Sequence, residues 1–208
     1  MNLIPAKAPQ FIKGIFHNYV WDMPLLYKKT IYLTFDDGPN PDITPWVLQT
    51  LKQYQAKATF FCIGDNAKKY PDVLQQTISD GHSIGNHTFN HLKGWKTDTQ
   101  TYIENIEMAN VILNTKLFRP PYGRITNKQA KILQKQGYTI VMWSIISFDW
   151  EADLKEEDCL NNVINHAKDG SVIVFHDSYK AAKNMQYALP KVLDFFSKKG
   201  YQFKGLTV

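Results

Sequence analysis

Cysteine is scarce in this 208-residue chain, which contains only Cys62 and Cys159. Small domains that depend on disulfides use many more cysteines, so the sequence excludes a disulfide framework as the basis of the fold. Cys62 lies within an apolar stretch and is predicted to be a small buried hydrophobe. No motif places a base beside it, so a catalytic thiol is not expected.

Long apolar runs are also missing. No stretch of about 18 apolar residues could span a membrane. The first 21 residues have no apolar core followed by small residues at a cleavage site, so no export signal is predicted in this chain. That favours the cytoplasm, while the cell envelope or secretion stays open for a protein whose leader has been removed.

Two kinds of binding signal are absent as well. Neither Gly-x-Gly-x-x-Gly nor P-loop spacing follows the first predicted strand, which argues against a nucleotide site. The net charge of +5 and the isoelectric point of about 9.0 would permit attraction to anionic polymers. The lysines are scattered, however, without a basic block interleaved with aromatics, so no nucleic-acid partner is predicted. Nothing in the sequence specifies a protein partner.

What the sequence does contain is an alternation of strand-like and helix-like segments. Hydrophobic residues make up 44% and aromatic residues 13% of the chain, which suffices for one well-buried domain. Short β-branched or aromatic runs separated by longer amphipathic stretches predict repeated βα units. Such units leave either an open doubly wound sheet or a closed or distorted barrel. The predicted strands are 30–35, 58–63, 82–85, 139–144, 171–176 and 201–208.

Prolines, glycines and one capping motif mark the predicted helix ends. Pro45, Pro71 and Pro190 are expected in first turns, where a missing N–H does no harm. Thr126 and Gln129 have the spacing of a capping box. Four glycines that follow helical patterns are expected to adopt the left-handed conformation: Gly81, Gly137, Gly170 and Gly200.

Two adjacent carboxylates, Asp36 and Asp37, directly follow the first predicted strand. Neighbouring carboxylates repel each other and resist desolvation, so in a cleft they need a metal ion, a proton or a cationic partner. A solvated turn is the alternative, because the following Gly38 and Pro39 are common turn residues.

A pair of histidines, His87 and His91, has the four-residue spacing at which side chains on one helical turn converge. With Asp36 or Asp37 they would form a two-His, one-carboxylate set, which suits a catalytic Zn²⁺ or a similar divalent ion. Such a pair also occurs by coincidence on surfaces and in cores. Thr88 stands where zincin metalloproteases have Glu, so this is not the zincin motif.

Five segments together resemble, in order and separation, the motifs of the polysaccharide deacetylase family, which has the NodB homology domain and is also called carbohydrate esterase family 4. The segments are 34–40, 87–91, 119–123, 149–150 and 174–177. The resemblance implies an α/β fold, a distorted (β/α) barrel of about seven parallel strands. It implies one catalytic domain over residues 1–208, with a motif-bearing core at about 30–208 after an N-terminal lead-in, 1–29. The implied activity is hydrolysis of N-acetyl groups on glycans that contain N-acetylglucosamine, such as peptidoglycan or chitin.

The resemblance also assigns roles around one metal ion. Asp36 corresponds to the general base, which takes a proton from a metal-bound water. Asp37, His87 and His91 correspond to the metal ligands. Zn²⁺ is the ion expected, although Co²⁺, Ni²⁺ and Mn²⁺ tolerate such ligands too. The backbone N–H of Tyr122 corresponds to the donor that stabilises the oxyanion.

A second group of residues is implied to protonate the leaving amine and to bind the substrate. His176 corresponds to the general acid, a role that imidazolium can fill near neutral pH. Arg119 is expected to tether the base, and Asp149 to orient His176 and raise its pKa. Tyr122, Trp150 and Val174 are expected to line the pocket for the acetyl methyl and a sugar face, with ordinary core packing as the alternative for Val174.

Two departures from the family motifs leave these groups intact. Ile146 occupies a position that commonly holds Asp, and Val174 replaces the usual Leu. Two alternatives to a glycan N-deacetylase stay open. One is a hydrolase of a small amide, a cyclic imide or an O-acetyl ester, and the other is a catalytically silent carbohydrate-binding module.

Overall fold

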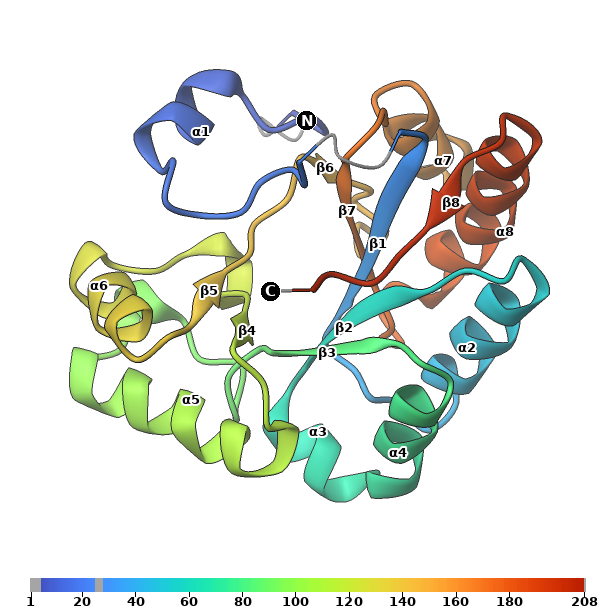
Figure 1. Cartoon of the computed structure of the whole chain (residues 1–208). Coiled ribbons are helices and arrows are strands. Elements are labelled where there is room, and N and C mark those ends of the chain that lie inside the picture. The colour runs from blue at the N-terminus through green and yellow to red at the C-terminus, as the bar shows by residue number, and fades with distance from the viewer. Residues whose placement is uncertain (1–4, 25–27, 208) are drawn as a thin grey trace.

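Seven parallel strands form a curled sheet with helices packed around its outside (Figure 1). The computed structural model describes residues 5–24 and 28–207. The strand order is β5-β4-β3-β2-β1-β7-β6, and an additional short strand, β8, pairs with the start of β1. The strands are β1 (Thr30–Asp36), β2 (Ala58–Cys62), β3 (Ser83–Asn86), β4 (Leu117–Phe118), β5 (Thr139–Ile140), β6 (Ile145–Ile146), β7 (Val172–His176) and β8 (Gln202–Phe203). The predicted barrel is therefore confirmed.

The helices follow the strands in the alternation that the sequence predicts. They are α1 (Gln10–Ile15), α2 (Ile43–Gln53), α3 (Gly64–Lys69), α4 (Pro71–Ser79), α5 (Thr99–Leu113), α6 (Asn127–Lys135), α7 (Glu156–Ile164) and α8 (Ala182–Lys198). Two single 3₁₀ turns, η1 (Gly94–Lys96) and η2 (Pro121–Gly123), lie in loops at the carboxyl ends of the strands. In the part of the chain that the structure describes, no helix combines the length and the apolar character needed to cross a bilayer.

The N-terminal segment lies across the opening between the two terminal strands of the sheet, β5 and β6. Ala6 accepts a hydrogen bond from Ile146 N at 2.8 Å, and Ala8 N donates to Ser144 O at 2.9 Å. Val20 N donates to Ile140 O at 2.8 Å. These backbone bonds satisfy edge groups that a fully closed barrel would pair between strands. Of the predicted lead-in 1–29, residues 1–4 and 25–27 lie outside the described residues.

Alternation along β1 decides which side chains face the interior of the barrel. Ile31, Leu33 and Phe35 pack in the large core between the sheet and the outer helices, where Phe35 stacks on Phe60 with ring centroids 5.0 Å apart. Successive side chains on a strand point to opposite faces, so Thr34 and Asp36 point inward. The two-residue alternation therefore places the polar side chains of Thr34 and Asp36 on the same, inward face of β1.

The other end of the barrel is closed by apolar residues. Tyr32, Phe61, Val172 and Leu206 belong to one buried cluster, and Leu206 N donates to Thr59 Oγ1 at 2.8 Å. Figure 1 shows the chain after β8 running into the ring of strands, and Leu206 of this segment packs in the cluster. The predicted last strand, 201–208, is only Gln202–Phe203, and Val208 lies outside the described residues.

Two predictions about local structure are wrong. Of the expected strand 139–144, only Thr139–Ile140 forms a strand, β5, and the next strand, β6, begins at Ile145. Between them the carbonyls of Val141 and Met142 bond the Arg119 guanidinium. Pro190 does not begin a helix but lies inside α8, since the buried apolar stripe of α8 packs on the core along its length. The Thr126 capping box and the four left-handed glycines are confirmed.

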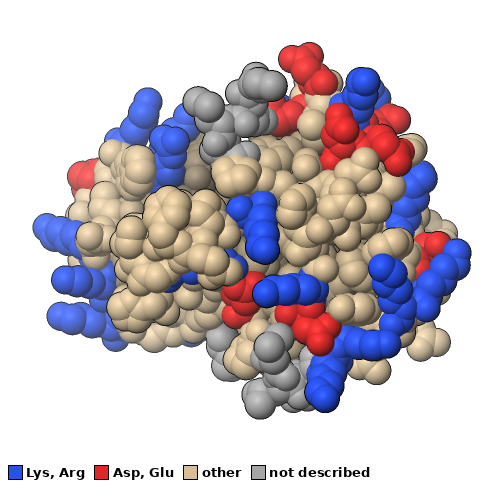
Figure 2. Space-filling model, turned by 90° about the horizontal axis from the view of Figure 1, so that it is seen from above, with Lys and Arg blue, Asp and Glu red and all other residues tan. Residues whose placement is uncertain are grey.

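Charged side chains are spread over the surface. Figure 2 shows Lys and Arg at several separate places around one face, with Asp and Glu among them.

Candidate active site

Five side chains that carry the predicted chemistry meet at the carboxyl ends of the parallel strands. Asp36 ends β1 and His176 ends β7, while His87 follows β3, Arg119 follows β4 and Asp149 follows β6. Because parallel strands end at the same edge, groups far apart in sequence converge there. The cleft at this edge has a volume of about 900 Å³, within the range of small-molecule sites.

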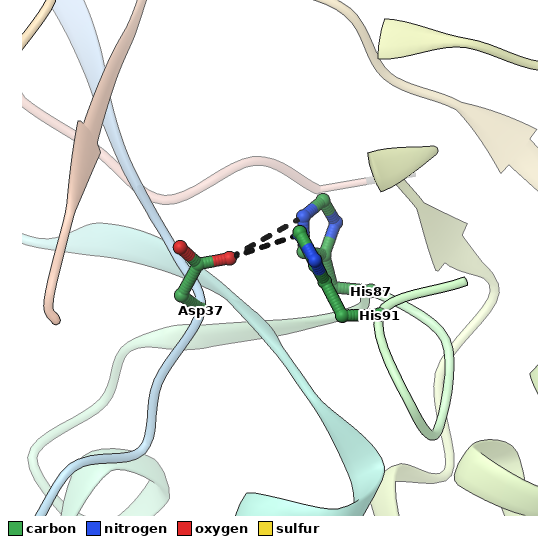
Figure 3. A group of neighbouring side chains, drawn as sticks. All are labelled: Asp37, His87 and His91. Atoms are coloured by element: carbon green, nitrogen blue, oxygen red, sulfur yellow. Dashed lines mark ion pairs between the residues drawn. The ribbon is translucent and has the colours of Figure 1, made fainter. Parts of the chain in front are cut away.

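Asp37, His87 and His91 form a compact group of potential metal ligands (Figure 3). Their ligand atoms all lie within 4.8 Å of one another. Asp37 Oδ1 is 3.8 Å from His87 Nε2 and 3.3 Å from His91 Nε2. This buried oxygen has no hydrogen-bond partner among the described residues, and an orphaned acceptor facing two ring nitrogens fits a divalent cation.

The orientation of His87 leaves one ring nitrogen available to a metal. His87 Nδ1 lies 2.7 Å from the carbonyl oxygen of Arg119. A carbonyl oxygen can only accept, so Nδ1 carries the proton and Nε2 presents its lone pair toward Asp37. Burial lowers the pKa of His87 to about 4, which keeps the imidazole neutral, as a ligand must be.

The two histidines converge through a loop rather than through a helical turn, so the helical interpretation of their spacing is wrong. Residues 87–91 follow β3 and belong to no helix. Thr88 and His91 have φ angles of 64° and 55°, in the left-handed region. Asn105 on α5 fixes the loop, because its Oδ1 accepts from Phe89 N at 2.8 Å and from Asn90 N at 3.1 Å.

Asp36 is held by a fully buried arginine. Arg119 Nη1 donates to Asp36 Oδ1 and to Thr34 Oγ1, each at 2.7 Å. The guanidinium also donates to the carbonyls of Val141 at 3.3 Å and Met142 at 2.8 Å. Burial lowers the pKa of Arg119, opposed by the charge of Asp36, and guanidinium remains protonated in proteins. One carboxylate of the Asp36-Asp37 pair therefore has a cationic partner.

Asp37 is the carboxylate that faces the imidazoles. Burial by itself would raise the pKa of Asp37, but the neighbouring rings of His91, His176 and His87 lower it below its usual range. The φ angle of Asp37 is 80°, and this left-handed residue turns its side chain away from the direction that the strand gives to Asp36. Adjacent residues thus serve two different parts of the cleft.

His176 is paired with a fully buried aspartate. His176 Nδ1 lies 2.8 Å from Asp149 Oδ1, and His176 N donates to Asp149 Oδ2 at 2.7 Å. Burial alone would lower the pKa of His176, but the Asp149 carboxylate, with Asp37 and Asp36 beyond it, raises it to about 9. The imidazole is consequently protonated near neutral pH, with Nε2 as the second N–H donor.

The residues expected to line the pocket occupy different kinds of position. Trp150 packs edge-on against His176, with ring centroids 4.8 Å apart, and lines the cleft. Val174 is 1% exposed yet also lines the cleft, within an apolar wall that includes Ile146 and Phe148. Ile146, the departure from the family motif, therefore contributes to a hydrophobic surface.

Tyr122 lines the cleft on the side of His91. Tyr122 is 55% exposed, and its ring lies against that of His91, with centroids 4.7 Å apart. Its φ angle is 59°. The donors that close this turn are Gly123 N, to Pro120 O, and Arg124 N, to Pro121 O, so the Tyr122 N–H is not used in closing it.

Asp177, the last residue of the fifth motif, is a buried group for which the sequence suggested no role. Its Oδ1 accepts from Gly38 N at 3.0 Å, and its Oδ2 accepts from Thr44 Oγ1 at 2.5 Å. A Cβ at Gly38 would lie 2.0 Å from Asp177 Oδ2, so only glycine fits there. Burial raises the pKa of Asp177 to about 8. Asp177 thereby anchors the loop that carries Asp36 and Asp37 to β7.

Other candidate nucleophiles and ligands lie outside the cleft. His82 Nδ1 accepts from Ala58 N at 3.1 Å, and burial lowers its pKa to about 4, so His82 has a structural role. Cys62 and Cys159 are free and buried, and burial raises the pKa of both thiols. Neither cysteine has the depressed pKa of a reactive thiolate.

Comparisons with known proteins agree with this geometry. The sequence profile of the family described as polysaccharide deacetylase matches residues 26–141. A peptidoglycan-N-acetylglucosamine deacetylase of Bacillus cereus is 36% identical over 200 residues, which cover 88% of this chain and 88% of that protein. A chitooligosaccharide deacetylase of Azorhizobium caulinodans is 38% identical over 157 residues, covering 72% of this chain and 74% of that protein.

A solved structure gives the same result at the level of the fold. The Bc1960 peptidoglycan N-acetylglucosamine deacetylase, in complex with 4-naphthalen-1-yl-N-oxidanyl-benzamide, superposes with a TM-score of 0.87 at 35% identity. The match covers 96% of this chain and 95% of that one. Because the family profile covers more than half of the chain and relatives share about a third of their residues over most of its length, this chain belongs to the polysaccharide deacetylase family.

Proposed function

We propose that this protein is a metal-dependent hydrolase that removes N-acetyl groups from glycans containing N-acetylglucosamine, and that residues 1–208 form one catalytic domain. The similarity to peptidoglycan and chitooligosaccharide deacetylases supports the reaction class. The observation that carries the proposal is one cleft that combines the Asp37, His87 and His91 group with a carboxylate, Asp36, and a protonated imidazole, His176.

Asp37, His87 and His91 would hold the metal ion. Two imidazoles and one carboxylate suit Zn²⁺ best, with Co²⁺, Ni²⁺ and Mn²⁺ as other candidates. The orphaned Asp37 Oδ1 and the unprotonated Nε2 of His87 support the assignment. When bound, such an ion supplies Lewis acidity that lowers the pKa of water and polarises an acyl oxygen.

Asp36 would act as the general base. A water molecule adds its oxygen to the acetamide carbonyl carbon while Asp36 takes one of its protons. The second carboxylate oxygen is available for this step because the Arg119 bonds use Oδ1. Arg119 is itself held by hydrogen bonds to Thr34 on β1 and to Val141 after β5. It therefore fixes the direction of the Asp36 carboxylate, which needs no reorientation to accept the proton.

His176 would act as the general acid. Its Nε2 proton passes to the amide nitrogen as the carbon–nitrogen bond breaks, which gives acetate and a free amine on the sugar. An amide nitrogen is a poor leaving group unless it is protonated, so the reaction needs this donor. The raised pKa of His176, about 9, supports the role because the imidazolium persists at neutral pH.

The remaining residues would stabilise the oxyanion and the bound acetyl group. The Tyr122 N–H, which is not used in closing its own turn, is the proposed backbone donor to the developing oxyanion. The apolar wall of Val174 and the Trp150 ring would contact the acetyl methyl group. A small wall of this kind favours acetyl over bulkier acyl groups.

The test is acetate release from N-acetylglucosamine oligomers and from peptidoglycan fragments by metal-stripped protein, with and without added Zn²⁺ or Co²⁺. We expect release only with metal, and no release above background from the Asp36→Asn variant. Confirmed metal binding without release from either glycan would refute the substrate assignment. Failure to bind any divalent ion would refute the proposed site.

A further inference from the structure

One rim of the cleft carries an aromatic ring next to a guanidinium. Trp95, Lys96 and Arg124, here called the rim shelf, line the same cleft as Asp37 and His91. Trp95 is 62% exposed, although large apolar side chains usually avoid water. The Arg124 guanidinium carbon lies 4.9 Å from the centroid of the Trp95 ring.

The rim shelf is held in place by hydrogen bonds to neighbouring segments. Trp95 Nε1 donates to Ile125 O at 3.0 Å, which fixes the exposed ring. The fully buried Gln129 donates from Nε2 to Gly94 O at 2.9 Å. A Cβ at Gly94 would lie 2.6 Å from Arg124 O, so the turn that carries Trp95 is packed directly on the backbone of Arg124. An exposed aromatic ring on a rigid support is typical of a binding surface.

The charges around this cleft are unbalanced. Lys93 and Lys180 line it together with Lys96 and Arg124, and none of these four cations forms an ion pair with a residue that the structure describes. Beyond Asp36 and Asp37, the acidic residue on the cleft wall is Glu151, which accepts a hydrogen bond from Trp150 Nε1 at 3.0 Å. The chain has two arginines, Arg119 and Arg124, and both lie at this site.

We propose that the rim shelf binds a carboxylate-bearing sugar next to the acetylated one, so that acidic glycans of the peptidoglycan type are preferred over neutral chitin chains. This inference rests on the proposed deacetylase function. Trp95 offers a flat face to the C–H groups of a pyranose ring, and Arg124 can bind a carboxylate in a bidentate manner. A neutral glycan would form no ion pair with these four cations, whereas a carboxylate would.

The experiment compares three tetrasaccharides: a peptidoglycan fragment with free lactyl carboxylates, the same fragment with those groups converted to carboxamides, and the N-acetylglucosamine tetramer. The wild-type protein should show the lowest KM for the acidic fragment, and higher ionic strength should remove this advantage by screening. The Lys96→Ala/Arg124→Ala variant should raise the KM for the acidic fragment by about tenfold with kcat unchanged, since exposed ion pairs contribute roughly two- to fivefold each.

A matched control is Lys52→Ala/Lys128→Ala, which removes two exposed cations from α2 and α6 and should leave every KM unchanged. Trp95→Ala should raise the KM for all three tetrasaccharides, because the ring contacts sugar rather than carboxylate. Equal KM values for the acid and carboxamide forms of the fragment would overturn the inference while the deacetylase function stood.

Binding is measured separately, so that failure of turnover can be distinguished from failure of recognition. Calorimetric titration of the Asp36→Asn variant with the acidic and carboxamide fragments should show about tenfold tighter binding of the acid. That selectivity would support the rim shelf even if no acetate were released, whereas unselective binding or no binding would overturn it.

Discussion

The two buried ion pairs of the cleft, Asp36 with Arg119 and Asp149 with His176, are arranged in opposite senses. Their short contacts are alike, at 2.7 Å and 2.8 Å. In the first pair the carboxylate faces the cleft and the cation is fully buried, while in the second the cation faces the cleft and the carboxylate is fully buried. In both pairs the fully buried residue, Arg119 or Asp149, makes further hydrogen bonds besides the ion pair.

The comparison teaches how one protein interior can present a proton acceptor and a proton donor on the same cleft. A buried charge is costly unless it is paired and hydrogen-bonded. Arg119 meets that need through Thr34 and two carbonyl groups, and Asp149 through the N–H groups of His176. Each fixed partner then stabilises the opposite charge at the position that a substrate could reach.

The largest expected effect comes from removing a proposed metal ligand, because the proposed reaction needs the metal ion as well as both ion pairs. The His87→Ala variant should lose bound metal together with activity, because affinity depends on all ligands being present. Metal content by elemental analysis and acetate release measure the two losses. Replacing the exposed His17 by Ala should change neither quantity. Full metal occupancy in the His87→Ala variant would contradict the ligand assignment.

Removing the acceptor charge tests the first pair. The Asp36→Asn variant should lose roughly 10² to 10⁴-fold in kcat with metal content unchanged, because the amide keeps the shape but cannot take a proton. Steady-state acetate release and elemental analysis give both values. Asp72→Asn, on the exposed surface of α4, is the matched control. Near-normal turnover in the Asp36→Asn variant would rule out Asp36 as the base.

Removing the fixed cation should affect stability as well as activity. The Arg119→Met variant leaves the buried Asp36 carboxylate unpaired, so the free energy of unfolding should fall by about 3–5 kcal/mol. Denaturant unfolding of the metal-free protein measures this change. The double variant Asp36→Asn/Arg119→Met should recover part of the loss. Arg124→Met, at an exposed position, should stay within about 0.5 kcal/mol of wild type.

Replacing Asp149, the fully buried anion of the second pair, should shift the alkaline limb of the pH–rate profile. Because Asp149 raises the pKa of His176 to about 9, the imidazolium contributes stability that is complete below pH 6.5 and is lost as the pH rises through about 9. In the Asp149→Asn variant this pKa should fall, so the alkaline limb of kcat/KM and the alkaline loss of stability should both begin at lower pH. Rate and unfolding profiles over neutral to alkaline pH would show it. An unmoved alkaline limb would mean that His176 is not the acid.

The smallest expected effect is at Tyr122. The proposed contribution is a backbone N–H, which the Tyr122→Phe variant keeps, so kcat/KM should stay within about threefold of wild type, as expected for an exposed hydroxyl. Acetate release measures this ratio. A loss of about a hundredfold would show that the phenol takes part in the chemistry. The mechanism would then need a third proton-transferring group besides Asp36 and His176.

Sequence reasoning found the chemistry of the cleft better than its geometry. Asp36, Asp37, His87 and His91 were identifiable because charged and imidazole groups next to apolar strand patterns call for a partner. The helical explanation of the His87 and His91 spacing is wrong, since left-handed residues in a loop bring the rings together. Asn105 had no sequence signal, and Asp177 stood in the fifth motif without a suggested role, because each anchors a loop through backbone groups distant in the chain.

The sequence by itself determined the βα alternation and the set of ionisable residues, because hydrophobic period and residue type are local properties. The barrel was implied only by the resemblance to the deacetylase family. Only the tertiary structure decided which ring nitrogen of His87 is free and which cations remain without an ion pair at the rim shelf. Those outcomes depend on contacts between strand ends and loops separated by tens of residues. The buried partners in that shared interior, Arg119 and Asp149, hold the Asp36 carboxylate and the His176 imidazole at the same cleft.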